Sequence, residues 1–544
     1  MEKSKIIHLE EANTLAKFLT SEERHNVVSL KITGFIGRQD FDDVLDDMCD
    51  VYGLFDDDDN WVPDYSESAA IRHLDLGEAT YVDGEELPYF GFRAQLETFI
   101  LPKGIKSTIE GDEFETGLSE SEMLKSLILP EGLKTVEGFG SCPNLKGIVL
   151  PEGLEEIGSN SFSRCTAITS IQIPASVKYL YGSSFAGCQI KAYKVDSENP
   201  YLTAIDGVVF SKDLSTLVAF PSAYPHERYV VPETTLVIGE HAFEDSGVSD
   251  IVLPRKLSSI KYGAFQGSNI QKIEMPDSVT ELGELAFFGC FQLEYIRLSN
   301  SLTTIPCQTF SRCPKLKHLE IPESVKRIYY SAIAWSDGLE YLKLNDGLEE
   351  IVDEGPMSGV NGDLREVNLP KTLLKVPGGV FNYSPYIKEF NLDPKNPYFS
   401  TIDGALCSKD GKTLYSVPNV NRCSYEVPEG IEVIGKRALS YLPLLLTVEL
   451  PSTLRTIECR AFQGCDSLTH IQLPSGVTKI HIDALWGDNL KDIVMESAVP
   501  PEMTGILRDE ELRYRKVNLL VPENAVEAYK QASGWKSFNI LANK

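Results

Sequence analysis

Residues 168–188 read ITSIQIPASVKYLYGSSFAGC, and residues 145–165, 23 positions earlier, read LKGIVLPEGLEEIGSNSFSRC. Both stretches carry an apolar residue followed by proline, then a second apolar pair, a phenylalanine and a cysteine. This sequence pattern recurs along most of the chain at intervals that are mostly 22 or 23 residues. A unit this short cannot bury its own apolar face and must stack on its neighbours, so the repeat predicts a solenoid.

Each unit predicts a short strand followed by a break. In the pattern L-x-x-I-x-L, alternate side chains lie on opposite faces of a strand. The proline that follows has no N–H group to donate to a neighbouring strand, so it ends the pairing. We expect the repeat phenylalanines, such as Phe162, to fill a shared interior. The units are marked by Pro102, Pro130, Pro151, Pro174, Pro232, Pro254, Pro276, Pro322, Pro370, Pro428, Pro451 and Pro474, with Ser299 and Asn345 in the same place of two units.

Two intervals are longer than the rest and match each other. Pro174 and Pro232 are 58 residues apart, as are Pro370 and Pro428, which corresponds to two units plus an insertion. The inserted stretches read ENPYLTAIDGVVFSKDLSTLVAFP and KNPYFSTIDGALCSKDGKTLYSVP, near residues 196–228 and 393–424. Alternating apolar residues around a polar turn predict a β-hairpin in each insertion. We expect both hairpins to project from the same edge of the solenoid.

Both ends of the chain differ from the repeat, which covers residues 96–497. Because the apolar ends of a stacked array need covering, we predict an α/β N-terminal cap over 1–95 and a C-terminal cap over 498–544. The expected N-terminal elements are a helix over 10–24, a strand over 27–32, an acidic helix over 41–52 and a strand over 71–76. The expected C-terminal elements are a strand over 517–521, a helix over 523–532 and an apolar lid of Trp535 and Phe538.

Composition excludes several classes of partner. The chain has 80 acidic and 51 basic residues, a formal net charge of -29, which would repel nucleic acid and anionic lipid surfaces. No run of 18 apolar residues occurs, so we expect no membrane insertion. Residues 1–8 lack the apolar core of a secretory signal, so no export signal is visible in this sequence.

The unit L-x-x-I-x-L-P-x-x-L-x-x-I-x-x-x-x-F-x-x-C, clear at 145–165 and 293–313, resembles the BspA-like (LRR_5-type) class of bacterial leucine-rich repeats. The resemblance implies a right-handed superhelix with a curved parallel β-ladder and short helical or irregular segments. Members of this family are typically exported to the bacterial cell surface, where some bind host matrix proteins such as fibronectin, or other bacteria. The resemblance carries no catalytic motif.

The 11 cysteines raise the question of disulfides or metal ligands. Other units carry serine at the cysteine position of the repeat, so we interpret it as a small, buried packing position, because serine would abolish a bridge or a ligand. Cys407 and Cys423 could pair, although Cys407 aligns with Phe210 of the first insertion, which favours packing. The cysteines at the repeat position are Cys142, Cys165, Cys188, Cys290, Cys313 and Cys465.

No motif in the sequence carries recognisable chemistry. The acidic tract Asp56 to Asp59 lacks the alternating spacing of a calcium loop. Gly411-Lys412-Thr413 is interpreted as a turn, because Leu406 stands where the first glycine of a phosphate-binding loop belongs. No nucleophile or zinc signature occurs, and none of the eight histidines has a sequence neighbour at ligand spacing. We therefore expect no enzyme activity, no cofactor and no metal.

The outward face of the strand ladder is the candidate binding site. In each unit the residues before and after the central apolar residue point outward, and equivalent positions of neighbouring strands lie about 5 Å apart. Three successive units thereby stack an aromatic row beside a row of alternating charge, a composition that is favoured at protein interfaces and whose aromatic row suits sugar rings. The alternative that these side chains merely support one another across the sheet stays open. The candidate residues are Tyr295, Arg297, His318, Glu320, Tyr341 and Lys343.

We therefore expect a non-enzymatic adhesion protein that presents a concave repeat surface to an extracellular protein or glycan, within a possible larger surface complex. One alternative is a glycan- or peptide-capturing subunit of a bacterial nutrient-uptake complex. A remote alternative is a hydrolase with an unrecognised site. The family resemblance favours the cell surface, and the lack of a visible export signal leaves a cytoplasmic location as the alternative.

Overall fold

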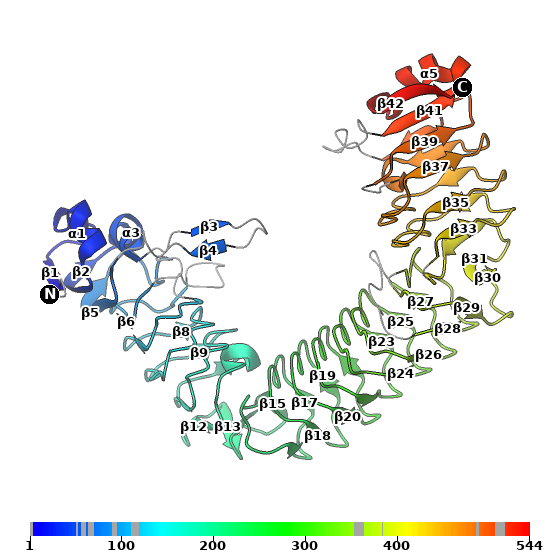
Figure 1. The fold of residues 1–544 in the computed structure, drawn as a ribbon. Coiled ribbons are helices and arrows are strands. Elements are labelled where there is room, and N and C mark those ends of the chain that lie inside the picture. The colour runs from blue at the N-terminus through cyan, green and yellow to red at the C-terminus, as the bar shows by residue number, and fades with distance from the viewer. Residues whose placement is uncertain are drawn as a thin grey trace. The chain divides into compact units, whose positions relative to one another are not determined.

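The computed structural model describes residues 4–49, 53–55, 61–63, 70–89, 95–109, 119–352, 364–382, 384–420, 422–485, 489–505 and 517–543. In this part of the chain the backbone forms a parallel β-solenoid of about 21 turns, which confirms the fold expected from the repeat (Figure 1). The chain divides into two compact units, Met1–Pro276 (unit 1) and Asp277–Lys544 (unit 2). The acidic tract Asp56 to Asp59 lies outside the described residues.

Unit 1 consists of short strands and a few helical turns. Its helical segments are η1 (Leu15–Lys17), α1 (Ser21–Asn26), α2 (Arg38–Asp40), η2 (Phe41–Leu45), α3 (Asp46–Cys49) and η3 (Gly182–Phe185). Its strands are β1 (Ser4–Leu9), β2 (Ser29–Ile36), β3 (Gly53–Phe55), β4 (Trp61–Pro63), β5 (His73–Tyr81), β6 (Thr98–Ile100), β7 (Ser126–Ile128), β8 (Thr135–Val136), β9 (Glu156–Ile157), β10 (Ile171–Ile173), β11 (Tyr179–Leu180), β12 (Tyr193–Val195), β13 (Leu202–Ile205), β14 (Val208–Ser211), β15 (Thr216–Ala219), β16 (Arg228–Val230), β17 (Val237–Ile238), β18 (Asp250–Val252), β19 (Ser259–Ile260) and β20 (Lys272–Glu274).

Unit 2 has the same composition of elements. Its helical segments are η4 (Ile482–Leu485), η5 (Glu523–Ala525), α5 (Val526–Gln531) and η6 (Trp535–Ser537). Its strands are β21 (Glu281–Leu282), β22 (Tyr295–Arg297), β23 (Thr304–Ile305), β24 (His318–Ile321), β25 (Arg327–Ile328), β26 (Tyr341–Leu344), β27 (Glu350–Ile351), β28 (Glu366–Leu369), β29 (Glu389–Leu392), β30 (Phe399–Ile402), β31 (Ala405–Ser408), β32 (Thr413–Ser416), β33 (Ser424–Glu426), β34 (Val433–Ile434), β35 (Thr447–Glu449), β36 (Thr456–Ile457), β37 (His470–Leu473), β38 (Lys479–His481), β39 (Asp492–Met495), β40 (Glu502–Thr504), β41 (Asn518–Pro522) and β42 (Asn539–Asn543).

Each repeat contributes to two parallel ladders. The first ladder contains the three- or four-residue strands of the L-x-x-I-x-L pattern, such as β16, β18 and β20 in unit 1 and β24, β26 and β28 in unit 2. The second ladder contains two-residue strands that follow the proline, such as β8, β9 and β11. Sequence reasoning identified these residues only as a second apolar pair, because two residues are too few to show a strand period.

The repeat phenylalanines lie in the shared interior, as expected. Phe139, Phe162 and Phe185 are fully or almost fully buried. Their rings stack from rung to rung, with centroids 5.9 Å and 5.4 Å apart and interplanar angles of 10° and 16°. In unit 2, Phe287 and Phe310 repeat this stack at 5.7 Å. The stacks extend the apolar interior along the solenoid, where each ring buries a large area.

The cysteine position of the repeat is a buried packing site, and in several units its side chain donates a hydrogen bond to a main-chain carbonyl oxygen. All 11 cysteines are free thiols, including buried Cys407 and exposed Cys423. In unit 2 the Ser336 hydroxyl makes the equivalent bond and donates to the carbonyl oxygen of Phe310 at 2.7 Å, whereas the Ser246 and Ser384 hydroxyls are buried without a hydrogen-bond partner in the described part of the chain. Burial raises the pKa of the Cys465 thiol to about 12, which keeps it protonated. The matching thiol donors are Cys165 to Phe139 (3.3 Å), Cys188 to Phe162 (3.1 Å), Cys313 to Phe287 (3.2 Å) and Cys465 to Leu439 (3.1 Å).

The N-terminal segment differs from the prediction in one helix. The expected helix over 10–24 is wrong, because the chain forms only η1 and then starts the separate helix α1 at Ser21. Thr20 is extended and its hydroxyl accepts the Glu23 N–H, while the Glu23 carboxylate accepts the Thr20 N–H, a capping box that begins a new helix. The acidic helix predicted over 41–52 corresponds to η2 and α3, which follow directly after α2, and residues 50–52 lie outside the described part.

At the C-terminal end, β39, β41 and β42 continue a parallel sheet, and helix α5 follows β41. Trp535 is fully buried, its indole N–H donates to the Pro501 carbonyl oxygen at 2.8 Å, and its ring lies 5.5 Å from that of Phe538. The division into a repeat region and two caps stays a prediction.

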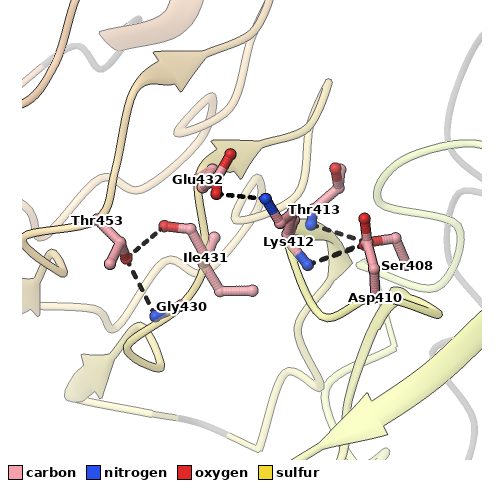
Figure 2. A network of polar contacts seen from close by, with 8 residues as sticks. All are labelled: Ser408, Asp410, Lys412, Thr413, Gly430, Ile431, Glu432 and Thr453. Carbon is pink, nitrogen blue, oxygen red and sulfur yellow. Dashed lines mark hydrogen bonds and ion pairs between the residues drawn. The ribbon is translucent and has the colours of Figure 1, made fainter.

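The two insertions share one topology. In the first, β13, β14 and β15 form an antiparallel meander whose last strand joins the second ladder through β17. In the second, β30, β31 and β32 do the same and join β34. Figure 2 shows the turn of the second insertion, in which the Ser408 hydroxyl accepts the N–H groups of Lys412 (3.2 Å) and Thr413 (2.9 Å). Gly411-Lys412-Thr413 is therefore a hairpin turn, as interpreted from the sequence.

Candidate functional site

Strands β22, β24 and β26 bring the six candidate residues together on one outward face, which we call the Tyr-His-Tyr face. Tyr295 and Tyr341 are 43% and 47% exposed, and His318 is also exposed. The central residue of each strand points inward, since Ile296, Leu319 and Leu342 are buried. The strand period of two therefore places the candidates outward, as the sequence predicted.

Register fixes which side chains of this face are neighbours. In the parallel pair β24 and β26, His318 lies opposite Tyr341 and Glu320 lies opposite Lys343. The His318 and Tyr341 rings lie 6.0 Å apart at an angle of 48°. The Lys343 ammonium forms an ion pair with the Glu320 carboxylate. The face thus has an aromatic row and a charged row, and the members on β24 and β26 contact each other across these two strands.

Side chains outside the six candidates hold the charged row in place. The amide of Asn345, which occupies the proline position of its unit, donates to Glu320 at 3.2 Å and to the Ile321 carbonyl oxygen at 2.9 Å. The Lys343 ammonium, followed by the Asn345 amide, lowers the pKa of Glu320. Arg297 pairs with Asp277 at 3.1 Å. The sequence marks Asn345 by its place at the proline position of the unit, but that place alone does not predict its contact with Glu320.

A groove with a volume of about 770 Å³ runs over this face. All six candidate residues line it, together with Asn300, Glu323 and Asn345. The lining combines aromatic rings, both signs of charge and side-chain amides. Such a surface can stack against flat groups and can accept and donate hydrogen bonds.

One group of side chains in the described residues has the geometry of metal ligands. Cys459, His481 and Asp483 each offer one ligand atom, and these atoms lie within 4.8 Å of one another. The His481 ring nitrogen Nδ1 accepts the Asp483 N–H at 3.2 Å. Sequence reasoning missed this neighbourhood because Cys459 is 22 residues away from His481, one rung along the solenoid. Three half-buried ligands could hold a soft divalent ion such as Zn²⁺, with one position left to solvent.

Comparison with known families identifies the repeat. The description "BspA type Leucine rich repeat region" matches six copies within residues 89–216, 236–355 and 415–501, which make up more than half of the chain. The chain therefore belongs to the family of BspA-type leucine-rich repeat proteins. That description names a repeat region and no reaction.

Several solved structures are similar to the chain over most of its length. A leucine-rich repeat protein from Eubacterium ventriosum has 16% identity and a TM-score of 0.38, over 75% of this chain and 88% of that one. A leucine-rich repeat protein from Bacteroides ovatus has 18% identity and a TM-score of 0.38, over 72% and 88%. A leucine-rich cell surface protein from Faecalibacterium prausnitzii has 20% identity and a TM-score of 0.35, over 72% and 79%.

No curated protein matches the chain. Within the described residues, the helices are all too short or too polar to cross a membrane.

Proposed function

We propose that the chain is a non-enzymatic adhesion protein of the bacterial cell surface that binds an extracellular protein through the Tyr-His-Tyr face. The observation that carries the proposal is the groove of about 770 Å³ that all six outward side chains line. Exposed tyrosines beside paired charges give large contact area and orientation-dependent polar contacts. The chain belongs to the BspA-type repeat family, and its resemblance to that family implies binding at the cell surface. This membership supports the same conclusion.

The test is a set of direct binding measurements with purified proteins. The full chain is passed over immobilised fibronectin, laminin and collagen and over a glycan array. The variant with Tyr295, His318 and Tyr341 all replaced by alanine should bind its protein partner at least tenfold more weakly, because aromatic side chains dominate interface energies. Its melting temperature should stay close to that of the unmodified chain, because all three side chains are exposed.

Tyr386→Ala is the matched control, since this tyrosine is 46% exposed and does not line the groove. Unchanged binding by the triple variant, or an equal loss with Tyr386→Ala, would remove the Tyr-His-Tyr face as the site. Binding only to oligosaccharides would replace the protein partner by a glycan and favour the nutrient-uptake alternative.

A further inference from the structure

The second ladder of unit 1 is interrupted where the first insertion enters. Strand β11 ends the sheet β8-β9-β11, and the next second-ladder strand along the chain, β15, belongs to a different sheet. Within the described residues, β11 therefore has a strand partner on one side only. An edge strand of this kind is a template for the addition of another strand.

A pocket of about 670 Å³ lies at this break. One wall is the continuous segment Lys178 to Gly182, which contains β11, and the opposite wall includes Thr216 and Val218 of β15. At the end of the first wall, a Cβ atom on Gly182 would lie 2.4 Å from the carbonyl oxygen of Glu240, which follows β17. Gly182 therefore packs directly against the main chain of Glu240, and both residues line the pocket.

Main-chain hydrogen bonds show how β11 is oriented toward this gap. The N–H groups of Tyr179 and Tyr181 donate to the carbonyl oxygens of Glu155 (3.2 Å) and Ile157 (3.3 Å) on the β9 side. Because main-chain groups alternate along a strand, the N–H and C=O of Leu180 point away from β9, toward the pocket. The pocket is thus lined by an edge that can hydrogen-bond an extended peptide.

Three exposed tyrosines surround the edge. Tyr179 and Tyr181 flank buried Leu180 and are 63% and 42% exposed. Tyr201 comes from the insertion and is 45% exposed. All three line the pocket. Tyrosines of this kind contribute contact area at small entropic cost and are common where proteins recognise peptides.

Charged side chains of both signs line the pocket: the carboxylates of Asp213 and Glu240 and the ammonium groups of Lys178 and Lys212. Burial, followed by the nearby carboxylates of Glu156, Glu137 and Glu240, raises the pKa of the Tyr181 phenol. The Lys178 ammonium is paired with Glu155 at 2.7 Å, and the Lys212 ammonium donates to the Asn199 carbonyl oxygen at 2.6 Å. A basic side chain of a ligand would therefore find aromatic faces and a carboxylate at the same place.

The second insertion provides an internal comparison. Its frame is the same, since a Cβ atom on Gly378 would also meet the carbonyl oxygen of the facing residue, Lys436. Alignment of the two insertions places Lys375, Pro377 and Lys436 where the first has Tyr179, Tyr181 and Glu240. The aromatic walls and the carboxylate are thus replaced by lysines and a proline, residues that discourage strand addition at edges.

We infer that the first insertion forms a peptide-binding site, in which an extended segment of a partner protein adds a strand to the free edge of β11 and places a basic side chain between Tyr181 and Glu240. Main-chain hydrogen bonds to Leu180 supply affinity, and the three tyrosines select side chains on alternate positions of the peptide. This site belongs to unit 1 and is independent of the Tyr-His-Tyr face of unit 2.

The test is a selection from a phage library of random linear heptapeptides on the full chain. Peptides are counter-selected on the variant Tyr179→Lys/Tyr181→Pro/Glu240→Lys, which carries the side chains of the second insertion. We expect enriched peptides with an arginine or lysine among alternating β-branched or apolar residues. Their affinity should fall roughly tenfold or more in Tyr201→Ala, the loss that corresponds to about 1.4 kcal/mol.

Two controls make the result decisive. Tyr398→Ala removes the 52% exposed counterpart of Tyr201 in the second insertion and should leave peptide binding unchanged. N-methylation of alternate amides of the selected peptide should abolish binding if it pairs as a strand. The inference is overturned if no peptide is enriched over the variant, if N-methylation has no effect, or if neutral oligosaccharides rather than peptides depend on Tyr201.

Discussion

The two insertions have the same main-chain frame, but different side chains, which we call the walls, face the break in the ladder beside each one. In the first, the buried amide of Asn199 accepts the N–H groups of Tyr201 and Leu202 at 2.8 Å and donates to the carbonyl oxygens of Pro174 and Val177 at 2.9 Å. In the second, Asn396 makes the same four contacts, with Tyr398, Phe399, Pro370 and Leu373.

The turns are also the same. Asp206-Gly207 and Asp403-Gly404 both have positive φ, at 51° and 78° and at 49° and 77°, which is typical of tight hairpins. The side chains that face the break in the ladder differ: they are tyrosines and a carboxylate in the first insertion, and lysines and a proline in the second. We therefore expect the shared frame to determine stability and the differing side chains to determine whether a peptide binds.

The largest expected effect concerns the interior on which both insertions rest. Phe162→Ala should lower the free energy of unfolding by about 3–5 kcal/mol, because the ring stacks between Phe139 and Phe185 and its loss leaves a cavity. Denaturant unfolding measures the change. A loss below about 1 kcal/mol would contradict the shared interior.

The frame can be tested by changing it at both insertions. Asn199→Ala and Asn396→Ala should each cost roughly 2–4 kcal/mol, because each leaves buried main-chain groups without hydrogen-bond partners. Urea unfolding of the two variants gives the comparison. Similar losses would support a common frame, whereas a loss in only one variant would show that the insertions are built differently.

The cysteine position should tolerate serine in the rungs beside the first insertion. Cys165→Ser keeps a donor for the Phe139 carbonyl oxygen, as Ser336 does for Phe310, so the change in stability should stay within about 1 kcal/mol. Cys165→Val removes that donor and should cost more. An equal effect of the two substitutions, read from thermal melts, would mean that the hydrogen bond contributes nothing.

The smallest expected effect is a pH dependence confined to the acidic side of the first insertion. Burial, and then the Glu156 carboxylate, raises the pKa of Glu137 to about 7 from 4.5. The folded state therefore binds this proton more tightly than the unfolded state does. The stabilisation of the fold that this proton contributes is fully present below pH 4.5 and is lost as the pH rises through 7. In the Glu137→Gln variant, the urea concentration at the unfolding midpoint should change less between these two pH values than it does in the unmodified chain.

The matched position before the second insertion carries Tyr329 and no carboxylate, so Tyr329→Phe should leave the pH profile unchanged. Profiles of Glu137→Gln and the unmodified chain that coincide would refute the assignment.

Much of the fold can be predicted from the sequence because each repeat carries the same pattern of apolar residues and proline. The alternation of leucine and the proline that follows predict the first ladder. The repeat position that is cysteine in one unit (Cys165) and serine in another (Ser336) predicts a packing position. The structure confirms both predictions. The outward placement of Tyr295 and Tyr341 also followed from strand period alone. Sequence patterns are sufficient to predict a contact where it joins equivalent positions of neighbouring rungs.

The rest depends on features that the repeat does not encode. The break beside β11 arises where an insertion separates this strand from the next rung, and the repeat pattern does not show that β11 then lacks a strand partner on one side. The approach of Cys459 to His481 required that two rungs stack in register. The helix expected over 10–24 failed because the apolar period was given more weight than the Thr20 and Glu23 capping pair.

The most direct measurement of the claim that the walls decide binding is amide hydrogen exchange, followed by mass spectrometry, with and without a peptide selected on the full chain. We predict slower exchange in the segment Lys178 to Gly182, which contains the outward Leu180 amide, and no change in Leu374 to Gly378, its counterpart. Saturating peptide with unchanged exchange over Lys178 to Gly182 would contradict strand addition at β11.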